Sequence, residues 1–398
     1  MALDESSKLG WVLRHGTGKG YGWFRKGAKT KLRDLYSFSL EVSEEDAAVL
    51  NDLKERVKET ARVWRAIEES KGACWYSQPE ISSLSDSSLV SSLSVATLAN
   101  AMHLKKLIRK GIPPSFRPRV WMAVSGTVTQ RSTVPDSYYS DLTEAVKDKV
   151  TAATRQIDHD LARTFPTHPW LNSPEGHRTL RQILVAYSFR DSRVGYCQGM
   201  NYVAALLLLV LKSEEDAFWM LAALLERVLY SDIYSENLYG CHIEQRVFKD
   251  LLMKKFPRLA AHLDLIQFDV SLITTEWFLC LFAKSLPTET TMRVWDVLFS
   301  EGVKVLFRVA LAIFKMKEAE LLSTKHVGEA ISIVQDTTNR AYDPDILLKV
   351  AFEDLGAMTM YIISEHRKKQ QPAVVAELEE RLQRVNSPRS NRPTQVLL

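Results

Sequence analysis

From residue 103 to residue 363, apolar residues recur every three or four positions in one segment after another, which is the spacing of helices that bury one face. No part of this region alternates polar and apolar residues for long enough to predict a strand. Acidic first turns and a following proline or glycine mark several helix ends. The pattern therefore predicts an all-α region that includes helices over 216–230, 277–286, 289–301 and 303–322, with Thr288 capping the third of these.

The longest apolar run covers nine residues, from Val203 to Leu211. A membrane span needs roughly 20 apolar residues, so this run predicts a buried core helix. The N-terminus has acids early and no apolar core of a signal peptide, so we expect no secretory leader. None of the four cysteines forms a C-x-x-C pair, which favours reduced thiols in the cytoplasm.

The segments on either side of the helical region differ from it in composition. Ser43 followed by Asp46 resembles a helix cap and Gly72 a helix stop, around apolar residues at helical spacing. The chain is predicted to divide into a basic, glycine- and aromatic-rich segment (1–42), an amphipathic helix (43–72), a serine-rich linker (73–100), the helical region (101–363) and a polar tail with a short amphipathic helix (364–398). The first of these segments is expected to be small and irregular or β-like.

Composition and charge narrow the function classes only a little. Apolar residues make up 46% and charged residues 25% of the chain, as in ordinary soluble globular proteins. The net charge of +4 is too balanced to indicate nucleic-acid binding. The first 33 residues hold eight basic and two acidic residues, a local charge of +6. This segment is expected to be solvated, and contact with an anionic membrane is the alternative.

Three motifs resemble known sites but lack an essential part. The glycine-rich run Gly16–Gly20 lacks the spacing of a phosphate-binding loop. Cys197 lacks the glutamine that precedes a caspase-like nucleophile, so we expect a small buried residue there. The run 158–160, Asp-His-Asp, with His168 and His177 further on, could hold a metal, but no regular ligand spacing appears. A solvated helix face is the commoner outcome.

Two other segments carry stronger candidates. On a helix, Asp160 and Arg163 lie on one face, with Ile157 one turn back, so the carboxylate can hold the guanidinium in a fixed pose. Thr-Phe-Pro then ends the helix and leaves Arg163 near the surface. By spacing alone, an ordinary surface ion pair is the commoner explanation.

The second candidate segment is a loop directly before the long apolar run. Gly195 and Gly199 allow a tight turn, so Gln198 can project from the start of the helix that follows. By itself, a glutamine beside glycine in a loop is usually just solvated.

Together these segments resemble the I-x-x-D-x-x-R and Y-x-Q motifs of the TBC domain, the Rab GTPase-activating module. The resemblance covers roughly residues 105 to 325, and several separated motifs occur in the expected order. Besides Ile157 to Arg163, the matching segments are Arg109 to Trp121, Tyr196 to Asn201, Ala217 to Trp219, Trp277 to Phe282, Leu286 to Asp296 and Phe299 to Gly302.

The resemblance implies a fold and a set of roles. It implies an all-α domain of two adjoining helical subdomains over 101–363. It implies that Arg163 is an arginine finger inserted into a partner GTPase and that Gln198 is a second, glutamine finger. Supporting roles fall to Asp160, which would orient the arginine, to Tyr196, which would buttress the glutamine loop, and to the motif positions Ile157, Gly199 and Asn201.

It also implies a partner and a place of action. The expected partner is a GTP-bound Rab GTPase, which brings its own GTP and Mg²⁺, so the chain itself is expected to need no cofactor or metal, to bind no nucleic acid and to catalyse no reaction alone. We expect a cytoplasmic regulator of vesicle trafficking, with recruitment to endomembranes as an option. Two alternatives remain: a TBC-fold adaptor that binds the GTPase without accelerating it, and a metal-dependent phosphohydrolase built on Asp158, His159 and Asp160.

Overall fold

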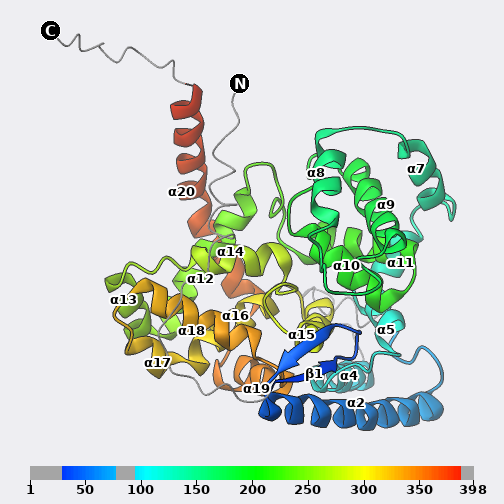
Figure 1. The fold of residues 1–398 in the computed structure, drawn as a ribbon, viewed down its shortest axis with the longest axis horizontal. Helices are drawn as coiled ribbons and strands as arrows, with labels where there is room; N and C mark the ends of the chain where they lie inside the picture. The colour runs from blue at the N-terminus through cyan, green and yellow to red at the C-terminus, as the bar shows by residue number, and fades with distance from the viewer. Residues whose placement is uncertain (1–28, 78–94, 387–398) are drawn as a thin grey trace.

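The computed structural model describes residues 29–77 and 95–386, and most residues in these ranges are helical (Figure 1). This confirms the predicted all-α class. The elements, in chain order, are β1 (Thr30–Arg33), β2 (Ser39–Val42), α2 (Glu44–Lys71), α4 (Val95–Lys110), α5 (Arg117–Val124), α6 (Thr127–Arg131), α7 (Tyr138–Val146), α8 (Ala152–Leu161), α9 (Pro174–Arg190), α10 (Met200–Leu211), α11 (Glu214–Ala223), the π-helical turn η3 (Leu224–Val228), α12 (Tyr239–Lys255), α13 (Pro257–Leu265), α14 (Ser271–Cys280), α15 (Thr288–Glu301), α16 (Lys304–Met316), α17 (Glu318–Leu322), α18 (Val327–Asn339), α19 (Pro344–Lys349), the π-helical turn η4 (Val350–Asp354) and α20 (Met360–Asn386).

The helices form two adjoining groups, which Figure 1 shows on opposite sides of the molecule. One group packs α5 to α11 around α10, the helix of the long apolar run, whose side chains are almost all buried. The other packs α12 to α18 around α16, which is equally buried. Helix α15 contacts members of both groups, so its buried face joins the two cores. No helix in the described ranges is long and apolar enough to span a bilayer.

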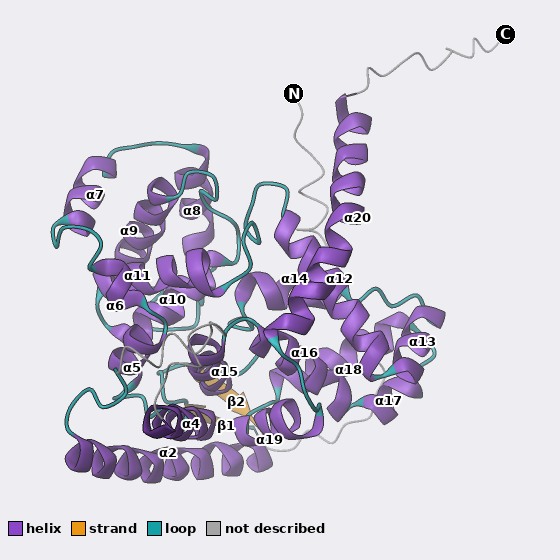
Figure 2. Cartoon of the chain, turned by 180° about the vertical axis from the view of Figure 1, so that it is seen from behind, coloured by secondary structure: helices purple, strands orange, loops and turns teal. Residues whose placement is uncertain are grey.

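An antiparallel hairpin and a long helix precede the two groups (Figures 1 and 2). Strands β1 and β2 pair from Thr30 opposite Val42 to Arg33 opposite Ser39. Helix α2 begins after Ser43, whose hydroxyl accepts from the Asp46 N–H, and ends at Gly72, close to the bounds that its sequence predicts. The glycine-rich run at 16–20 and most of the serine-rich linker lie outside the described residues.

A buried ionic cluster ties the hairpin to the helical core. The Arg117 guanidinium is fully buried and donates to Glu289 at 2.8 Å and to Asp296 at 3.0 Å. It also donates to the hydroxyl of Tyr36, in the hairpin turn. Asp296 accepts in addition from the Trp121 indole at 2.8 Å. Removing one member of such a buried cluster typically costs about 3–5 kcal/mol, because it leaves an uncompensated charge.

Two predicted helix boundaries are wrong. The helix predicted over 277–286 begins earlier, at Ser271, and ends at Cys280, because Leu281 and Phe282 take left-handed backbone conformations (φ 48° and 64°). Both side chains are fully buried, so core packing decides this ending. The helix predicted over 303–322 is two helices, α16 and α17, separated at Lys317.

Two smaller expectations also need correction. The helix predicted over 216–230 has the acidic first turn that its sequence predicts, since it begins at Glu214 behind an N-cap at Ser213, but it changes to the π-helical turn η3 after Ala223. Thr288 is the first residue of α15 and not its cap, a position that Pro287 takes.

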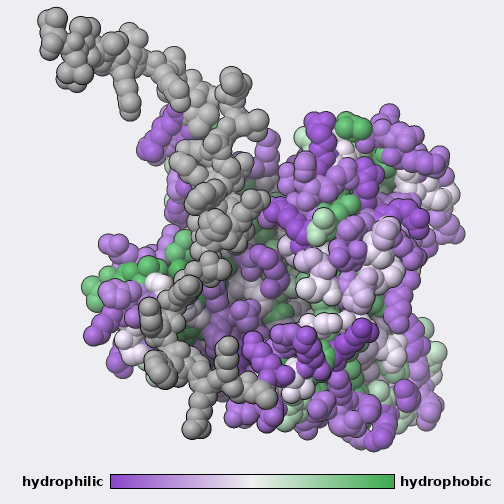
Figure 3. Space-filling model, viewed as in Figure 1, coloured by the Kyte–Doolittle hydropathy of each residue, from purple (hydrophilic) through white to green (hydrophobic). Residues whose placement is uncertain are grey.

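Helix α20 starts on the body of the molecule and then projects from it (Figures 1 and 2). Near its start, Arg367 donates two hydrogen bonds to Glu244 of α12, at 2.6 and 2.7 Å, and both side chains are buried. The predicted boundary between residues 363 and 364 therefore falls inside this helix. Polar side chains cover most of the face shown in Figure 3, and apolar colour gathers where α13 lies, the helix that carries the exposed Leu265.

Candidate functional site

The first candidate segment lies at the end of helix α8. Thr151 and Thr154 form a reciprocal capping box at its start, which fixes the helix register. Ile157 and Asp160 point into the core and are fully buried. Arg163 follows the last helical residue by two positions, and its side chain is 45% exposed against 1% for Asp160. The register thus anchors one end of the ion pair and leaves the other in solvent.

Asp160 collects donors from both candidate segments. Its Oδ1 accepts from Arg163 Nε at 2.8 Å and from Nη2 at 2.5 Å, and also from Gln156 at 3.2 Å. Its Oδ2 accepts from the Tyr196 hydroxyl at 2.7 Å. Burial and the Asp160 carboxylate raise the pKa of Tyr196 well above its usual range, so the phenol stays protonated and keeps donating. Among the described residues, Nη1 of Arg163 has no acceptor.

The second segment is a tight loop before α10. Gly199 has a φ of 119°, and a Cβ atom there would lie 2.8 Å from the Leu279 carbonyl oxygen, so only glycine fits without movement. Its N–H donates to the Asn201 side-chain oxygen at 3.0 Å. Gln198 comes directly before it and is exposed, and within the described part of the chain its side chain has no hydrogen-bond partner.

Asn201 links the two segments from inside. Its side-chain nitrogen donates to the Thr164 hydroxyl at 2.6 Å, and that hydroxyl donates to the Asp160 carbonyl at 2.7 Å. Both Asn201 and Thr164 are buried. The Tyr202 hydroxyl donates to the Arg163 carbonyl oxygen at 3.2 Å. The sequence analysis missed Thr164 and Tyr202, whose only signal was that each adjoins a candidate residue.

The structure thus brings all seven candidate residues into one connected region. Its frame consists of the fully buried Ile157, Asp160 and Asn201 and the half-buried Tyr196. Gly199 allows the turn, and the two exposed members, Arg163 and Gln198, extend from the frame. Cys197 is only half-buried, where a buried side chain was expected, because it lies on the loop rather than in α10. Burial and Asp160 raise its pKa to about 12, so the thiol is not an activated nucleophile.

Three residues of the metal-site alternative are engaged with other groups. Asp158 pairs with Arg181 at 2.6 Å, and Asp160 pairs with Arg163. His168 bonds through Nε2 to a backbone carbonyl of the hairpin turn at 2.9 Å. Over residues 29–77 and 95–386, no group of three or more histidine, cysteine or acidic side chains is placed to hold a metal ion.

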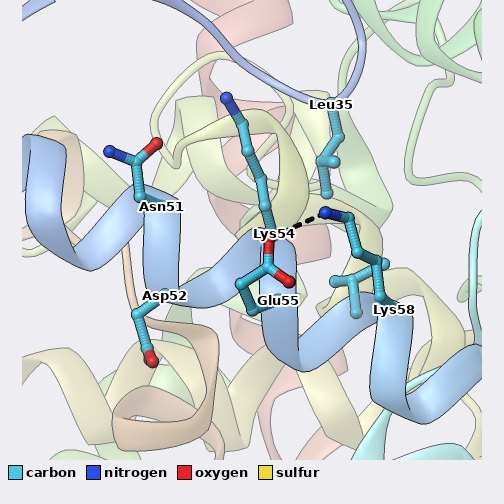
Figure 4. A pocket seen from close by; sticks show the side chains of 7 residues that line it. Leu35, Asn51, Asp52, Lys54, Glu55 and Lys58 are labelled. Atoms are coloured by element: carbon cyan, nitrogen blue, oxygen red, sulfur yellow. Dashed lines mark hydrogen bonds and ion pairs between the residues drawn. The ribbon is translucent and has the colours of Figure 1, made fainter.

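A shallow hollow lies apart from this region, between α2 and the hairpin turn (Figure 4). Across its floor, Lys58 pairs with Glu55 at 2.7 Å, and Lys54 donates to the Arg33 carbonyl. Its lining residues are Leu35, Asn51, Asp52, Lys54, Glu55, Val57 and Lys58. None of them belongs to the candidate site, whose exposed side chains are those of Arg163 and Gln198.

Comparison with known proteins points to one family. The model of the Rab-GTPase-TBC domain matches residues 114–322. Human TBC1 domain family member 2A is 39% identical over 285 residues, which are 71% of this chain and 31% of that protein. Human member 2B is 37% identical over 269 residues, 66% of this chain and 28% of that protein. The chain therefore spans about a third of the length of these curated relatives.

Similar solved structures belong to the same domain family. The TBC domain of a Chlamydomonas flagellar RabGAP is 35% identical, and the match covers 82% of this chain and all of that one with a TM-score of 0.68. The Ypt/Rab-GAP domain of Gyp1p is 22% identical over 63% of this chain and 91% of its own, with a TM-score of 0.55, which supports the fold alone.

Proposed function

The chain belongs to the Rab-GTPase-TBC domain family, and on that premise we propose that it is a GTPase-activating protein that supplies Arg163 and Gln198 to the active site of a Rab-type GTPase. The observation that carries the proposal is the pairing of these two exposed side chains on one buried frame, centred on Asp160. A buried carboxylate that bonds both an exposed arginine and the tyrosine of the glutamine loop fixes two groups relative to each other.

Arg163 is suited to neutralise charge on a transferring phosphoryl group. An arginine supplied in trans accelerates related GTPases by roughly 10³- to 10⁵-fold. Two donors of Arg163 are held by Asp160, which sets the plane of the guanidinium and leaves its outer edge facing solvent. A planar group fixed in this way loses little further freedom when it meets a phosphate oxygen.

Gln198 is suited to orient the attacking water. Its amide carbonyl can accept from the water while its NH₂ donates to a phosphate oxygen, and neither role needs a charge. The loop that carries it is stiffened by Gly199 and Asn201 on one side and by Tyr196 on the other. GTP and Mg²⁺ would arrive with the partner, so each group of this chain acts on another protein's substrate.

The test is GTP hydrolysis across a panel of GTP-loaded Rab GTPases, with wild type, Arg163→Lys and Gln198→Ala in parallel. We expect wild type to stimulate one or a few Rabs and each variant to lose at least about 100-fold of that stimulation, since lysine lacks the planar fork and alanine the amide. Arg193→Lys is the matched control, because Arg193 is an exposed arginine on the neighbouring loop that pairs with Asp191.

Two further proposals concern the cellular process and the location of the protein. We propose that it regulates vesicle trafficking. We also propose that it is cytoplasmic and reaches endomembranes through its partner or through its basic N-terminal segment. If some Rabs bind in the GTP state but none is stimulated, the activator proposal fails and the adaptor alternative replaces it.

A further inference from the structure

The turn of the N-terminal hairpin contacts the loop that carries Arg163. The buried ring of Phe38 packs edge-on against Phe165, with ring centroids 5.2 Å apart, and against His168 at 4.7 Å. Phe165 lies only two residues after Arg163. The hairpin, by contrast, lies outside residues 114–322, the span that the family model matches.

Hydrogen bonds make this contact rigid on the hairpin side. Asp34 Oδ1 accepts from the N–H groups of Tyr36 and Phe38, at 2.8 and 2.9 Å, which closes the turn. His168 Nδ1 accepts from the Leu171 N–H at 3.0 Å, so the ring proton is on Nε2, which donates to the Tyr36 carbonyl at 2.9 Å. The Tyr36 hydroxyl is held in turn by the buried arginine cluster of the core.

Phe165 has a second aromatic neighbour. Its ring packs edge-on against Tyr202, with centroids 5.2 Å apart, and the Tyr202 hydroxyl donates to the Arg163 carbonyl oxygen. Phe165 has a φ of 50°, a left-handed conformation that a bulky residue keeps only when its surroundings impose it. Phe38 and Tyr202 are the aromatic neighbours that hold this ring in place.

We infer that Phe38 is a positioning residue for Arg163: it packs Phe165 against Tyr202 and so holds the arginine loop in the pose that Asp160 completes. This inference rests on the proposed function, because it treats Arg163 as the arginine finger. It makes the hairpin part of the working machinery and not only a cover for the core. The loop conformation therefore depends on a segment more than 120 residues earlier in the chain.

The activity test compares Phe38→Ala with Val42→Ala under single-turnover conditions at saturating protein. Val42 is a buried apolar residue of the same hairpin, but it packs in a separate small cluster with Ala47 and Leu50. We expect Phe38→Ala to lower the maximal stimulated rate about tenfold with a nearly unchanged half-saturating concentration, since misplacing a group costs rate and not binding. Val42→Ala should leave both values near wild type.

A double variant separates positioning from general damage. In an Arg163→Ala background, Phe38→Ala should cause no further loss, because it acts only through the missing side chain. An equal loss in both backgrounds, or an equal loss from Val42→Ala, would overturn the inference. Phe38→Leu keeps apolar bulk and should recover much of the rate, and it serves as the working variant if alanine does not fold.

A second readout needs no GTPase. Hydrogen exchange should be faster across residues 162–169 in Phe38→Ala than in wild type, and unchanged there in Val42→Ala. Unchanged exchange in both variants would contradict the positioning role even if activation is real. Conversely, if wild type stimulates no Rab while the loop still loosens in Phe38→Ala alone, the proposed function has failed and the structural coupling stands.

Discussion

Asp160 is the residue on which the geometry of the site depends most directly. It is buried and accepts from Arg163, Gln156 and Tyr196, so three side chains take their direction from one carboxylate. The carboxylate is buried and the guanidinium is 45% exposed, so the pair fixes the direction of an exposed group from inside the core. Activity measurements report that orientation directly, whereas unfolding measurements also report the cost of disturbing a buried charge.

Asp160→Asn tests that orientation with almost no change in volume. The amide keeps one acceptor but turns two donors toward groups that already donate, so the guanidinium and the Tyr196 hydroxyl cannot both be satisfied. We expect at least about a tenfold fall in the stimulated hydrolysis rate, with binding to GTP-loaded Rab retained. Asp158→Asn is the control, because Asp158 lies on the same helix but pairs with Arg181. Equal effects from both variants would refute the orienting role.

Among the secondary-structure elements, helix ends are predicted correctly where a capping residue or a glycine alone decides them. Ser43 and Gly72 bound α2 as their types predict, and Gly302 ends α15. One of the predictions that fail concerns Leu281 and Phe282, where nothing in the residue types favours positive φ. Burial of both side chains overrides their helical propensity there, and burial of that kind depends on neighbours that are distant in sequence.

In the candidate site, too, local sequence predicts some features, and contacts between distant segments determine the others. The Asp160–Arg163 pair follows from helical spacing, and the need for glycine at Gly199 follows from a tight turn. The bonds from Tyr196 to Asp160 and from Asn201 to Thr164 join segments 36 and 37 residues apart. No local pattern specifies those bonds, and the same holds for the contact of Phe38 with the arginine loop.

Helix α20 offers a prediction about how an element is attached. Glu244→Gln leaves the Arg367 guanidinium buried without its full counter-charge, so we expect a loss of about 3 kcal/mol or more in the free energy of unfolding, or separate melting of α20. Glu377→Gln is the matched control, because that pair, with Arg246, joins the same two helices at the surface and should cost less than about 1 kcal/mol. Urea denaturation measures both, and similar costs for the two would contradict this picture of the attachment.

Across the whole molecule, buried thiols and phenols set the response to alkaline pH. Burial raises the pKa of Cys197 from 9.0 to about 12 and raises those of Cys241 and Cys280 as well. A raised folded-state pKa contributes stability that is fully present below the unfolded value and is lost as pH rises through the folded value. The protein should therefore lose stability steadily between about pH 9 and pH 12.

Urea denaturation in reducing buffer at a series of pH values measures this loss. Cys241→Ala should make the fall shallower, because it removes one buried thiol from the titration. A free energy of unfolding that stays constant up to pH 11 would show that these groups ionise as freely in the folded chain as in the unfolded one.

Different parts of the molecule contribute different parts of the candidate site. The helical group of α5 to α11 supplies the frame of the candidate site, the loops after α8 and before α10 carry the exposed Arg163 and Gln198, and the hairpin contacts the arginine loop. The family model matches residues 114–322, and the similarity to the solved Chlamydomonas TBC domain extends over 82% of the chain.

The most direct test of the central claim is catalytic turnover. A responsive Rab, loaded with GTP and in large excess over this protein, is followed for phosphate release, and binding to the GTP-loaded form is measured for the same samples. We predict many phosphates released per molecule of wild type, almost none above the intrinsic rate with Arg163→Lys or Gln198→Ala, and retained binding for both variants. Full turnover by either variant would contradict the two-finger account at that residue.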